Sequence, residues 1–334
     1  MSAMESNKVL VLNNGSAEDV ARSMIESGKQ KEPFFVFDID EANRRIQYFK
    51  QCMPRVQIFY GMSIIFAVPT KPAHWMTLLI RIKVEGDSVY KLGDKFGCDF
   101  ETEAFGLLDE AAALDVKVVG VAFHVGSACS SADSHLIGLQ RAKALFDYEE
   151  KAGRKMSIVD IGGGFLSDSI HRIDQVSSLV NSALDDLFPD QNIQVIAEPG
   201  RYICDSSMSL YCSLSNVRRV TKGDQRVNMV YMNDGLYGSL RYVEAWHTVK
   251  RFETITDKSI EASKAESTIL WGPSCDSFDR VKENIKMTLP QCSPLDWLVF
   301  PIHGAYTLRF ASNFSCLPKP LIRSVISRNL WYVL

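Results

Sequence analysis

The eight cysteines of this sequence include no Cys-x-x-Cys pair, so neither a metal site nor a redox dithiol is indicated. The first fifteen residues lack an apolar core of signal-peptide length, and no run approaches the length of a membrane span. Without a secretion signal, a chain of 334 residues is not expected to rest on a disulfide framework. We therefore expect a reducing, cytoplasmic setting and no membrane partner.

Strong charge of either sign is also absent. The formal net charge is −3, which gives no electrostatic reason to expect nucleic acid or an anionic membrane as a partner. Internal repeats and low-complexity tracts are missing too. What remains is an ordinary globular balance of 46% hydrophobic and 23% charged residues, in a chain long enough for two domains.

Three consecutive glycines, Gly162, Gly163 and Gly164, follow the short apolar run at residues 157–161. Glycine reaches backbone conformations closed to other residues and lets the main chain approach a ligand closely. At the carboxyl end of a strand, the bare N–H groups of such a turn can bind a phosphate. A tight strand-to-helix turn without a ligand explains the motif equally well.

The neighbouring segments favour the phosphate interpretation. Strand, helix, strand, helix and strand follow one another between residues 117 and 197, which implies parallel strands joined by right-handed crossovers. All three strands therefore end on one edge of the sheet, the edge where an α/β barrel builds its active site. The residues at these strand ends are His124, Ser127, Gly162, Gly163, Gly164, Glu198 and Arg201. Taken singly, His124 is better interpreted as a packed histidine, and Glu198 with Arg201 as a structural ion pair.

The predicted elements divide the chain into three parts. Residues 1–33 form an N-terminal segment, residues 34–205 an α/β domain and residues 206–334 a mostly antiparallel β domain. The last assignment follows from short apolar or alternating runs that turn residues separate after Met208. We expect the N-terminal segment to pack on the β domain.

The α/β domain holds too few strands for a closed barrel, which needs eight. One or two further strands near residues 208–214 would not complete it. We therefore expect an incomplete barrel, shortened between about residues 61 and 80. The five strand candidates are residues 56–60, 80–84, 116–124, 157–161 and 193–197.

Six short motifs occur in order along the chain. They span residues 123–127 (FHVGS), 160–165 (DIGGGF), 197–202 (AEPGRY), 233–239 (NDGLYGS), 271–276 (WGPSCD) and 304–307 (GAYT). In these motifs the chain resembles the eukaryotic ornithine decarboxylases and their non-catalytic relatives, the antizyme inhibitors, which are group IV decarboxylases dependent on pyridoxal 5′-phosphate (PLP). The resemblance implies a PLP-binding barrel of the alanine-racemase type, a β domain, and a cytoplasmic homodimer with active sites at its interface.

The resemblance also implies roles for the cofactor-binding residues. Glu198 would face the pyridine nitrogen and keep it protonated, so that the ring accepts electrons. Arg201 would add charge-assisted hydrogen bonds to the phosphate that the glycines hold, and His124 would stack on the ring. The full implied set is His124, Ser127, Gly162, Gly163, Gly164, Glu198, Arg201 and Tyr306.

Two further residues would act on the substrate. Cys275 would protonate the carbanion after CO₂ leaves, and Asp276 would bind the distal ammonium group of the substrate. In the family both come from the partner subunit, which is why the site needs a dimer. Taken alone, Cys275 is better interpreted as a small buried residue.

Two departures from the family pattern affect activity. The family has a cofactor-binding lysine directly after a Phe-Tyr pair, whereas Phe59 and Tyr60 are followed by Gly61. The next lysine, Lys71, stands in a different context and is not assigned that role. Where the family has a Tyr-Asp pair that helps to bind the substrate amine, this chain has Ala245-Trp246.

Two functions follow from this pattern. The first is decarboxylation of L-ornithine to putrescine in polyamine synthesis, which Cys275 and Asp276 favour because a binding protein needs no proton donor there. The second is that of an inactive homologue that binds antizyme, which the missing lysine favours. We interpret the short region between residues 61 and 80 as an incomplete product, such as a mis-joined gene model or splice form.

Overall fold

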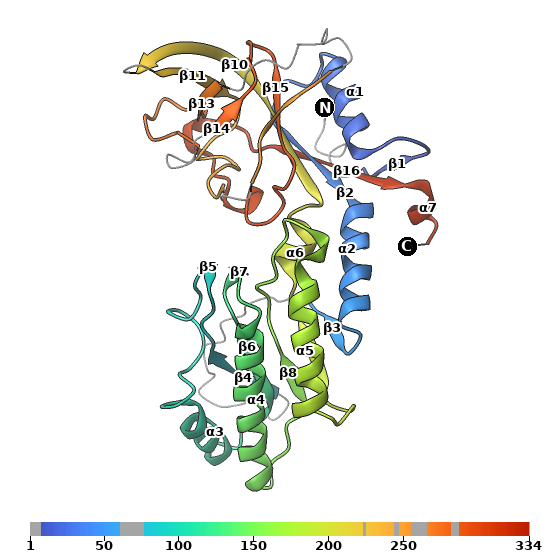
Figure 1. Cartoon of the computed structure of the whole chain (residues 1–334), viewed down its shortest axis with the longest axis vertical. Helices are drawn as coiled ribbons and strands as arrows, with labels where there is room; N and C mark the ends of the chain where they lie inside the picture. The colour runs from blue at the N-terminus through green and yellow to red at the C-terminus, as the bar shows by residue number, and fades with distance from the viewer. Residues whose placement is uncertain are drawn as a thin grey trace. The chain divides into compact units, whose positions relative to one another are not determined.

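The computed structural model describes residues 8–60, 77–222, 225–243, 247–254, 266–281 and 287–333, and it divides into two compact units (Figure 1). One of them, the β unit, comprises Met1–Asn43 and Cys204–Leu334. The other, the α/β unit, comprises Arg44–Ile203. Helix α2 (Ile39–Cys52) contains the first boundary and helix α6 (Gly200–Cys204) the second.

The α/β unit is built on a five-stranded, fully parallel sheet in the order β3-β9-β8-β6-β4. Its strands correspond to the five that the sequence predicted, and across the described residues the sheet stays open rather than closing into a barrel. The strands are β3 (Val56–Ile58), β4 (Thr77–Lys83), β6 (Lys117–His124), β8 (Ile158–Asp160) and β9 (Gln194–Ala197).

Helices cover the sheet because each presents an apolar stripe to it. Leu139 of α4 and Val180 of α5 are fully buried in the same core as Val121 and Val159 of the strands. Figure 1 shows α4 and α5 running side by side. The helices and short elements of the unit are α3 (Ala104–Ala113), α4 (Asp133–Lys151), α5 (Asp174–Leu187), a 3₁₀ turn at Ile170–Ile173, and the β5 (Ser88–Tyr90) and β7 (Ser127–Cys129) pair.

The β unit contains a nine-stranded sheet in which β10 (Met208–Lys222) is the central strand, paired with three others. Five of its eight pairings are antiparallel. The remaining strands are β1 (Leu10–Leu12), β2 (Phe34–Asp38), β11 (Gln225–Met232), β12 (Lys250–Phe252), β13 (Glu266–Trp271), β14 (Met287–Leu289), β15 (Trp297–Phe300) and β16 (Leu321–Ser327).

The N-terminal helix α1 (Ala17–Glu26) lies on this sheet. Ser16 caps it: its hydroxyl oxygen accepts the Asp19 N–H, and the Asp19 carboxylate accepts the Ser16 N–H. Ala21 and Ile25 then pack into the same core cluster as Phe34 of β2. Two 3₁₀ turns (Leu308–Phe310, Phe314–Cys316) and α7 (Arg328–Trp331) complete the unit.

Several predicted assignments differ from the structure. Strand β2 pairs with β10 and β16 and so belongs to the β unit, although residues 34–43 were expected in the α/β domain. The strand expected near residues 208–214 lies in β10 and adds nothing to the parallel sheet. Two of the short apolar runs taken as evidence for a β domain, residues 240–243 and 305–310, are not strands and instead form turns, bends and a 3₁₀ turn.

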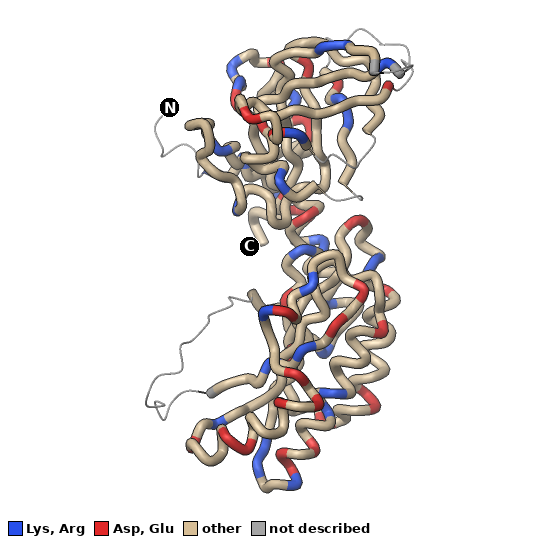
Figure 2. The backbone as a smooth tube through the Cα atoms, turned by 90° about the vertical axis from the view of Figure 1, so that its left-hand side faces the viewer, with Lys and Arg blue, Asp and Glu red and all other residues tan. Residues whose placement is uncertain are grey.

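Charge is spread evenly over both units. Figure 2 shows Lys and Arg interspersed with Asp and Glu along the described backbone, with no long stretch of one sign. Within the described ranges, no helix has both the length and the apolar character needed to cross a membrane.

Candidate functional site

The predicted residues of the α/β unit meet where β6, β8 and β9 end. A Cβ atom added to Gly163 would lie 2.9 Å from His124 Nε2 and 2.8 Å from the carbonyl oxygen of Glu198. The Glu198 N–H also donates to the Gly162 carbonyl oxygen at 2.7 Å. The His124 imidazole, the glycine turn and the main chain of Glu198 are therefore in direct contact, as the parallel order of the strands leads one to expect.

The glycine turn has no room for side chains. Gly162 has φ of 62°, and a Cβ there would lie 2.2 Å from the Phe123 carbonyl oxygen. Gly164 has φ of 108°, which L side chains rarely adopt. The Gly162 N–H donates to Asp160 Oδ1 at 2.8 Å, so the N–H groups of Gly163 and Gly164 are the candidates for an incoming anion.

His124 is uncharged near neutral pH. Burial lowers its pKa to about 4, and the charge of Arg81 adds to the shift. Its Nδ1 accepts the Gly126 N–H at 3.0 Å, which assigns the proton of the neutral ring to Nε2. That Nε2–H is the ring atom beside Gly163.

Three charged groups that share this strand edge perturb one another. Burial raises the pKa of Asp160 to about 7, against the opposing Gly162 N–H, and the Glu198 charge raises it further. Burial also raises the pKa of Glu198, while the Arg81 charge opposes that shift. Arg81 comes from β4 and stacks its guanidinium over the Phe96 ring at 5.0 Å.

Arg81 and Asp160 were not among the residues predicted for this site. The signal was available in the sequence, because each is a charged residue near the end of a mainly apolar strand. Such a residue is costly to bury without a partner, so its presence there indicates a function or a charge network.

A second polar contact lies in the same unit. Arg201 Nε donates to Ser127 Oγ at 3.0 Å, and both residues are buried, Arg201 at 7% and Ser127 at 9% exposure. The Arg201 guanidinium also lies 5.8 Å from the Tyr90 ring centroid. The contact links α6 to β7 and thus holds the two predicted phosphate ligands together.

The remaining predicted residues belong to the β unit. Asp276 accepts the Phe278 N–H at 3.0 Å and the Tyr237 hydroxyl, and these two bonds lower the pKa of its carboxyl. Cys275 beside it is exposed. Tyr306 has φ of 59° and is 47% exposed. Tyr237 was not predicted as a site residue, although it stands in one of the six motifs.

Other residues of the sequence-based predictions lie outside the described ranges. They are Gly61, Lys71, Ala245 and Trp246.

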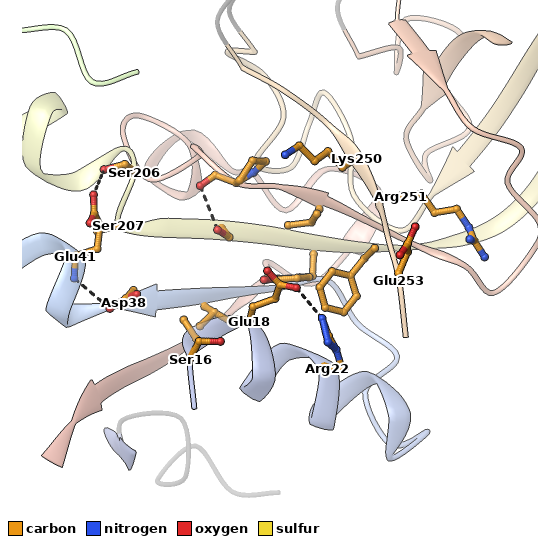
Figure 3. Close-up of a pocket in the computed structure, with 17 residues that line it drawn as sticks. Ser16, Glu18, Arg22, Asp38, Glu41, Ser206, Ser207, Lys250, Arg251 and Glu253 are labelled. Atoms are coloured by element: carbon orange, nitrogen blue, oxygen red, sulfur yellow. Dashed lines mark hydrogen bonds and ion pairs between the residues drawn. The ribbon is translucent and has the colours of Figure 1, made fainter. Parts of the chain in front are cut away.

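The β unit also contains a cavity of about 630 Å³ beside α1, β2 and β10 (Figure 3). Its charged lining has both signs, and part of it is already paired, as Arg22 bonds Glu18 at 2.7 Å. None of the predicted site residues lines it. In the described part of the chain, no group of three or more His, Cys, Asp or Glu residues is arranged to hold a metal ion.

Comparison with known proteins gives clear relatives. A family model, "Pyridoxal-dependent decarboxylase, pyridoxal binding domain", matches residues 62–205. Ornithine decarboxylase 2 of Drosophila melanogaster is 34% identical over 74% of this chain and 62% of its own length. Ornithine decarboxylase of Cricetulus griseus is 36% identical over 77% of this chain and 58% of its own length. The chain thus spans about three-fifths of the length of these relatives.

Solved structures show the fold. Arginine decarboxylase of Paramecium bursaria Chlorella virus superposes with a TM-score of 0.77 at 22% identity, covering 93% of this chain and all of that one. Lysine/ornithine decarboxylase of Vibrio vulnificus gives 0.71 at 20% identity, covering 96% of this chain and 98% of that one. The predicted fold, a barrel-type α/β domain plus a β domain, is confirmed by this likeness.

One relative matches over nearly the whole chain. Antizyme inhibitor 2 of Xenopus laevis is 30% identical over 95% of this chain and 75% of its own length. With the pyridoxal-binding family model, this match confirms the resemblance that the six motifs indicated. The chain belongs to the ornithine decarboxylase and antizyme inhibitor family of pyridoxal-dependent decarboxylases.

Proposed function

We propose that the strand-end site of the α/β unit binds PLP and is that of a decarboxylase converting L-ornithine to putrescine. One observation carries this proposal: a glycine turn without room for side chains lies between an uncharged imidazole, His124, and Glu198. This set fits a flat phosphorylated pyridine ring, which needs close main-chain approach, a stacking partner and an acidic partner for its nitrogen. When bound, PLP supplies the electron sink that lets CO₂ leave the substrate.

The residues of the α/β unit would bind and orient the ring. His124, being neutral, can stack on a cationic pyridinium without charge repulsion. Glu198 would hold a proton at the pyridine nitrogen, and a new cationic partner would favour its ionised form. Gly163 and Gly164 would bind the phosphate through their N–H groups, with Ser127 and Arg201 beside them.

The residues of the β unit would act on the substrate. The lowered pKa keeps Asp276 ionised, as binding of a distal ammonium group requires. Cys275 is accessible to donate a proton. Tyr306 would close the phosphate site. The proposal includes a homodimer, in which Cys275 and Asp276 act on the site of the partner subunit.

We place the cofactor-binding lysine in a segment that the parent protein has between residues 60 and 80. Two measurements test this. The first is the transcript between the codons of Tyr60 and Arg81, where an omitted exon that encodes a lysine after Phe-Tyr supports the proposal. The second is release of labelled CO₂ from carboxyl-labelled L-ornithine, by this chain and by the chain with that exon restored.

The expected result is CO₂ release by the restored chain. The present chain should bind PLP reversibly and keep no pyridoxyl label after borohydride reduction. A continuous cellular message without the lysine, together with no CO₂ release by any version, would contradict the proposal. L-lysine and L-arginine serve as competing substrates, because the residues that would distinguish them are Ala245 and Trp246.

A second candidate function is that of an antizyme inhibitor, a protein that binds antizyme without catalysis. One observation favours it: the antizyme inhibitor match spans 95% of this chain, whereas the ornithine decarboxylase matches span 73–77%. Pull-down of purified antizyme by this chain would support it when no CO₂ release is found. Absence of antizyme binding would remove it.

A further inference from the structure

We propose that Asp279 is a positioning residue, whose buried carboxyl group fixes the loop bearing Cys275 and Asp276 against the loop bearing Tyr237. Residue Asp279 is 1% exposed and lies between the two loops. The inference deepens the proposed function, on which the substrate role of Asp276 rests. The contacts that support it are independent of that function.

The two loops start side by side. Strands β11 and β13 are parallel neighbours, and Tyr231 near the end of one pairs with Trp271 at the end of the other. Residues 233–239 and 272–276 therefore leave the sheet from the same edge. Nothing in the parallel ladder itself holds the loops together beyond this point.

The carboxyl group of Asp279 bridges them. Its Oδ1 accepts the N–H of Leu236 at 2.8 Å, and its Oδ2 accepts the N–H of Ser274 at 2.9 Å. One oxygen thus serves each loop. If the carboxyl group were removed, both N–H groups would lose a hydrogen bond. Because the site is buried, water could not replace those bonds.

Two glycines make room for this bridge. A Cβ on Gly235 would lie 2.3 Å from Asp279 Oδ1, and one on Gly272 would lie 2.1 Å from the same atom. Each loop therefore has a glycine where it passes the carboxyl group. Such close approach on both sides is the arrangement expected of a specific bridge and not of chance packing.

The two N–H groups that the Asp279 carboxyl group binds lie one residue before Tyr237 and one residue before Cys275. Leu236 precedes Tyr237, whose hydroxyl donates to Asp276, and Ser274 precedes Cys275. The main chain of Asp279 adds two bonds: its N–H donates to the Asp276 carbonyl oxygen at 3.1 Å, and its own carbonyl accepts the Gly272 N–H at 2.8 Å. Asp279 thereby fixes the direction of the Asp276 carboxylate.

The variant Asp279→Asn tests the inference. An amide has one acceptor oxygen, so one of the two backbone N–H groups must lose its partner. Asp40→Asn is the matched control, since Asp40 also accepts a distant backbone N–H, that of Ser327 at 2.6 Å, in the same unit. Hydrogen exchange followed by mass spectrometry is measured on peptides covering residues 233–240 and 271–277.

We expect Asp279→Asn to speed exchange in both peptides by about tenfold, the effect of losing roughly 1.4 kcal/mol locally, and Asp40→Asn to leave them unchanged. Unchanged exchange in both peptides, or the same increase in the control, overturns the inference. If Asp279→Asn does not fold, Gly272→Ala replaces it, because the added Cβ would crowd the same carboxyl group.

Ligand affinities separate this inference from the proposed function. In the PLP-loaded chain, Asp279→Asn should weaken putrescine binding about tenfold and leave the dissociation constant of PLP within about twofold. A structural defect alone would weaken both. If the unsubstituted chain binds no putrescine, the proposed function fails, and the exchange data still decide whether Asp279 positions the loops.

Discussion

Proton equilibria at the strand-end site follow from where each residue stands. His124 and Asp160 are the last residues of apolar strands, and Glu198 directly follows one. The side chains of all three therefore stay partly buried. Burial favours the neutral form of each, and Arg81 lies close enough to influence all three. We therefore expect this site to bind a ligand that is itself charged.

Asp160 should make the chain less stable at high pH. Its pKa is about 7 in the fold and 3.8 in a free side chain, so the folded state keeps a proton that the unfolded state has released. The stabilisation is full below about pH 4 and is lost as pH rises through 7. We expect Asp160→Asn, whose oxygen can still accept the Gly162 N–H, to raise the free energy of unfolding by ~2–4 kcal/mol more at pH 8 than at pH 4.

Urea unfolding at the two pH values measures this difference. Asp185→Asn is the control in the same unit, because its side chain is 72% exposed, and its effect should stay within about 0.5 kcal/mol. An equal effect of Asp160→Asn at both pH values would show that the carboxyl group is not neutral in the fold.

His124 should resist protonation. Its folded pKa of about 4 lies below the usual 6.5, so this group contributes stability above pH 6.5 that is lost as pH falls towards 4. In a proton NMR titration, we expect the His124 ring signals to shift with a midpoint near 4, with His124→Asn used to assign them. A midpoint near 6.5 would mean that the ring is solvated and contradict its placement.

At the scale of elements, the pattern of apolar residues predicted those helices and strands whose apolar side chains are buried in the structure. The strand predicted at residues 157–161 is observed as Ile158–Asp160, and the two helices predicted between residues 117 and 197 are observed as α4 and α5. The five parallel strands could be predicted because each is a short, mainly apolar run between turn residues. The site edge could be predicted because parallel crossovers leave only one place for strand ends.

The features that could not be predicted depend on which strands and loops contact one another in the fold. Residues Phe34 to Phe37 are apolar on both faces, so nothing in their pattern distinguishes a barrel strand from a strand of the β sheet. The bridge by Asp279 joins residues 43 and 5 positions away, which only the folded loops reveal.

Helix α4 packs closely on β6, and a glycine allows it. A Cβ on Gly138 would lie 2.3 Å from the ring of Phe123, which is 1% exposed. We expect Gly138→Ala to lower the free energy of unfolding by ~1–3 kcal/mol, because a buried ring cannot move away freely. Gly106→Ala in α3 is the matched control, since no atom lies within 4 Å there, and it should stabilise by ~0.5–1 kcal/mol.

Thermal or urea unfolding of the two variants checks the pair. The free energy of unfolding should fall in Gly138→Ala and rise in Gly106→Ala. A destabilisation of similar size in both would mean that helix propensity, and not the contact with Phe123, sets the effect.

At the scale of the whole molecule, the proposed function requires two copies. Sedimentation equilibrium should show a concentration-dependent dimer. In an equal mixture of Asp276→Asn and Gly163→Val chains, putrescine binding should return to about a quarter of the sites, because about half of the dimers are mixed and one of their two sites is intact. A monomer at all concentrations, or no recovery on mixing, would contradict the shared site.

Strand β2 lies between β10 and β16 in the sheet order, although it comes from residues 34–38 and its neighbours from residues 208–222 and 321–327. A ribosome delivers these segments one after another, β10 about 170 residues after β2 and β16 about 280 residues after it. The strand that contains Phe34 and Phe35 therefore lacks its β10 partner for about 170 residues of translation and its β16 partner for about 280. We expect the nascent polypeptide to need shielding by chaperones throughout that interval.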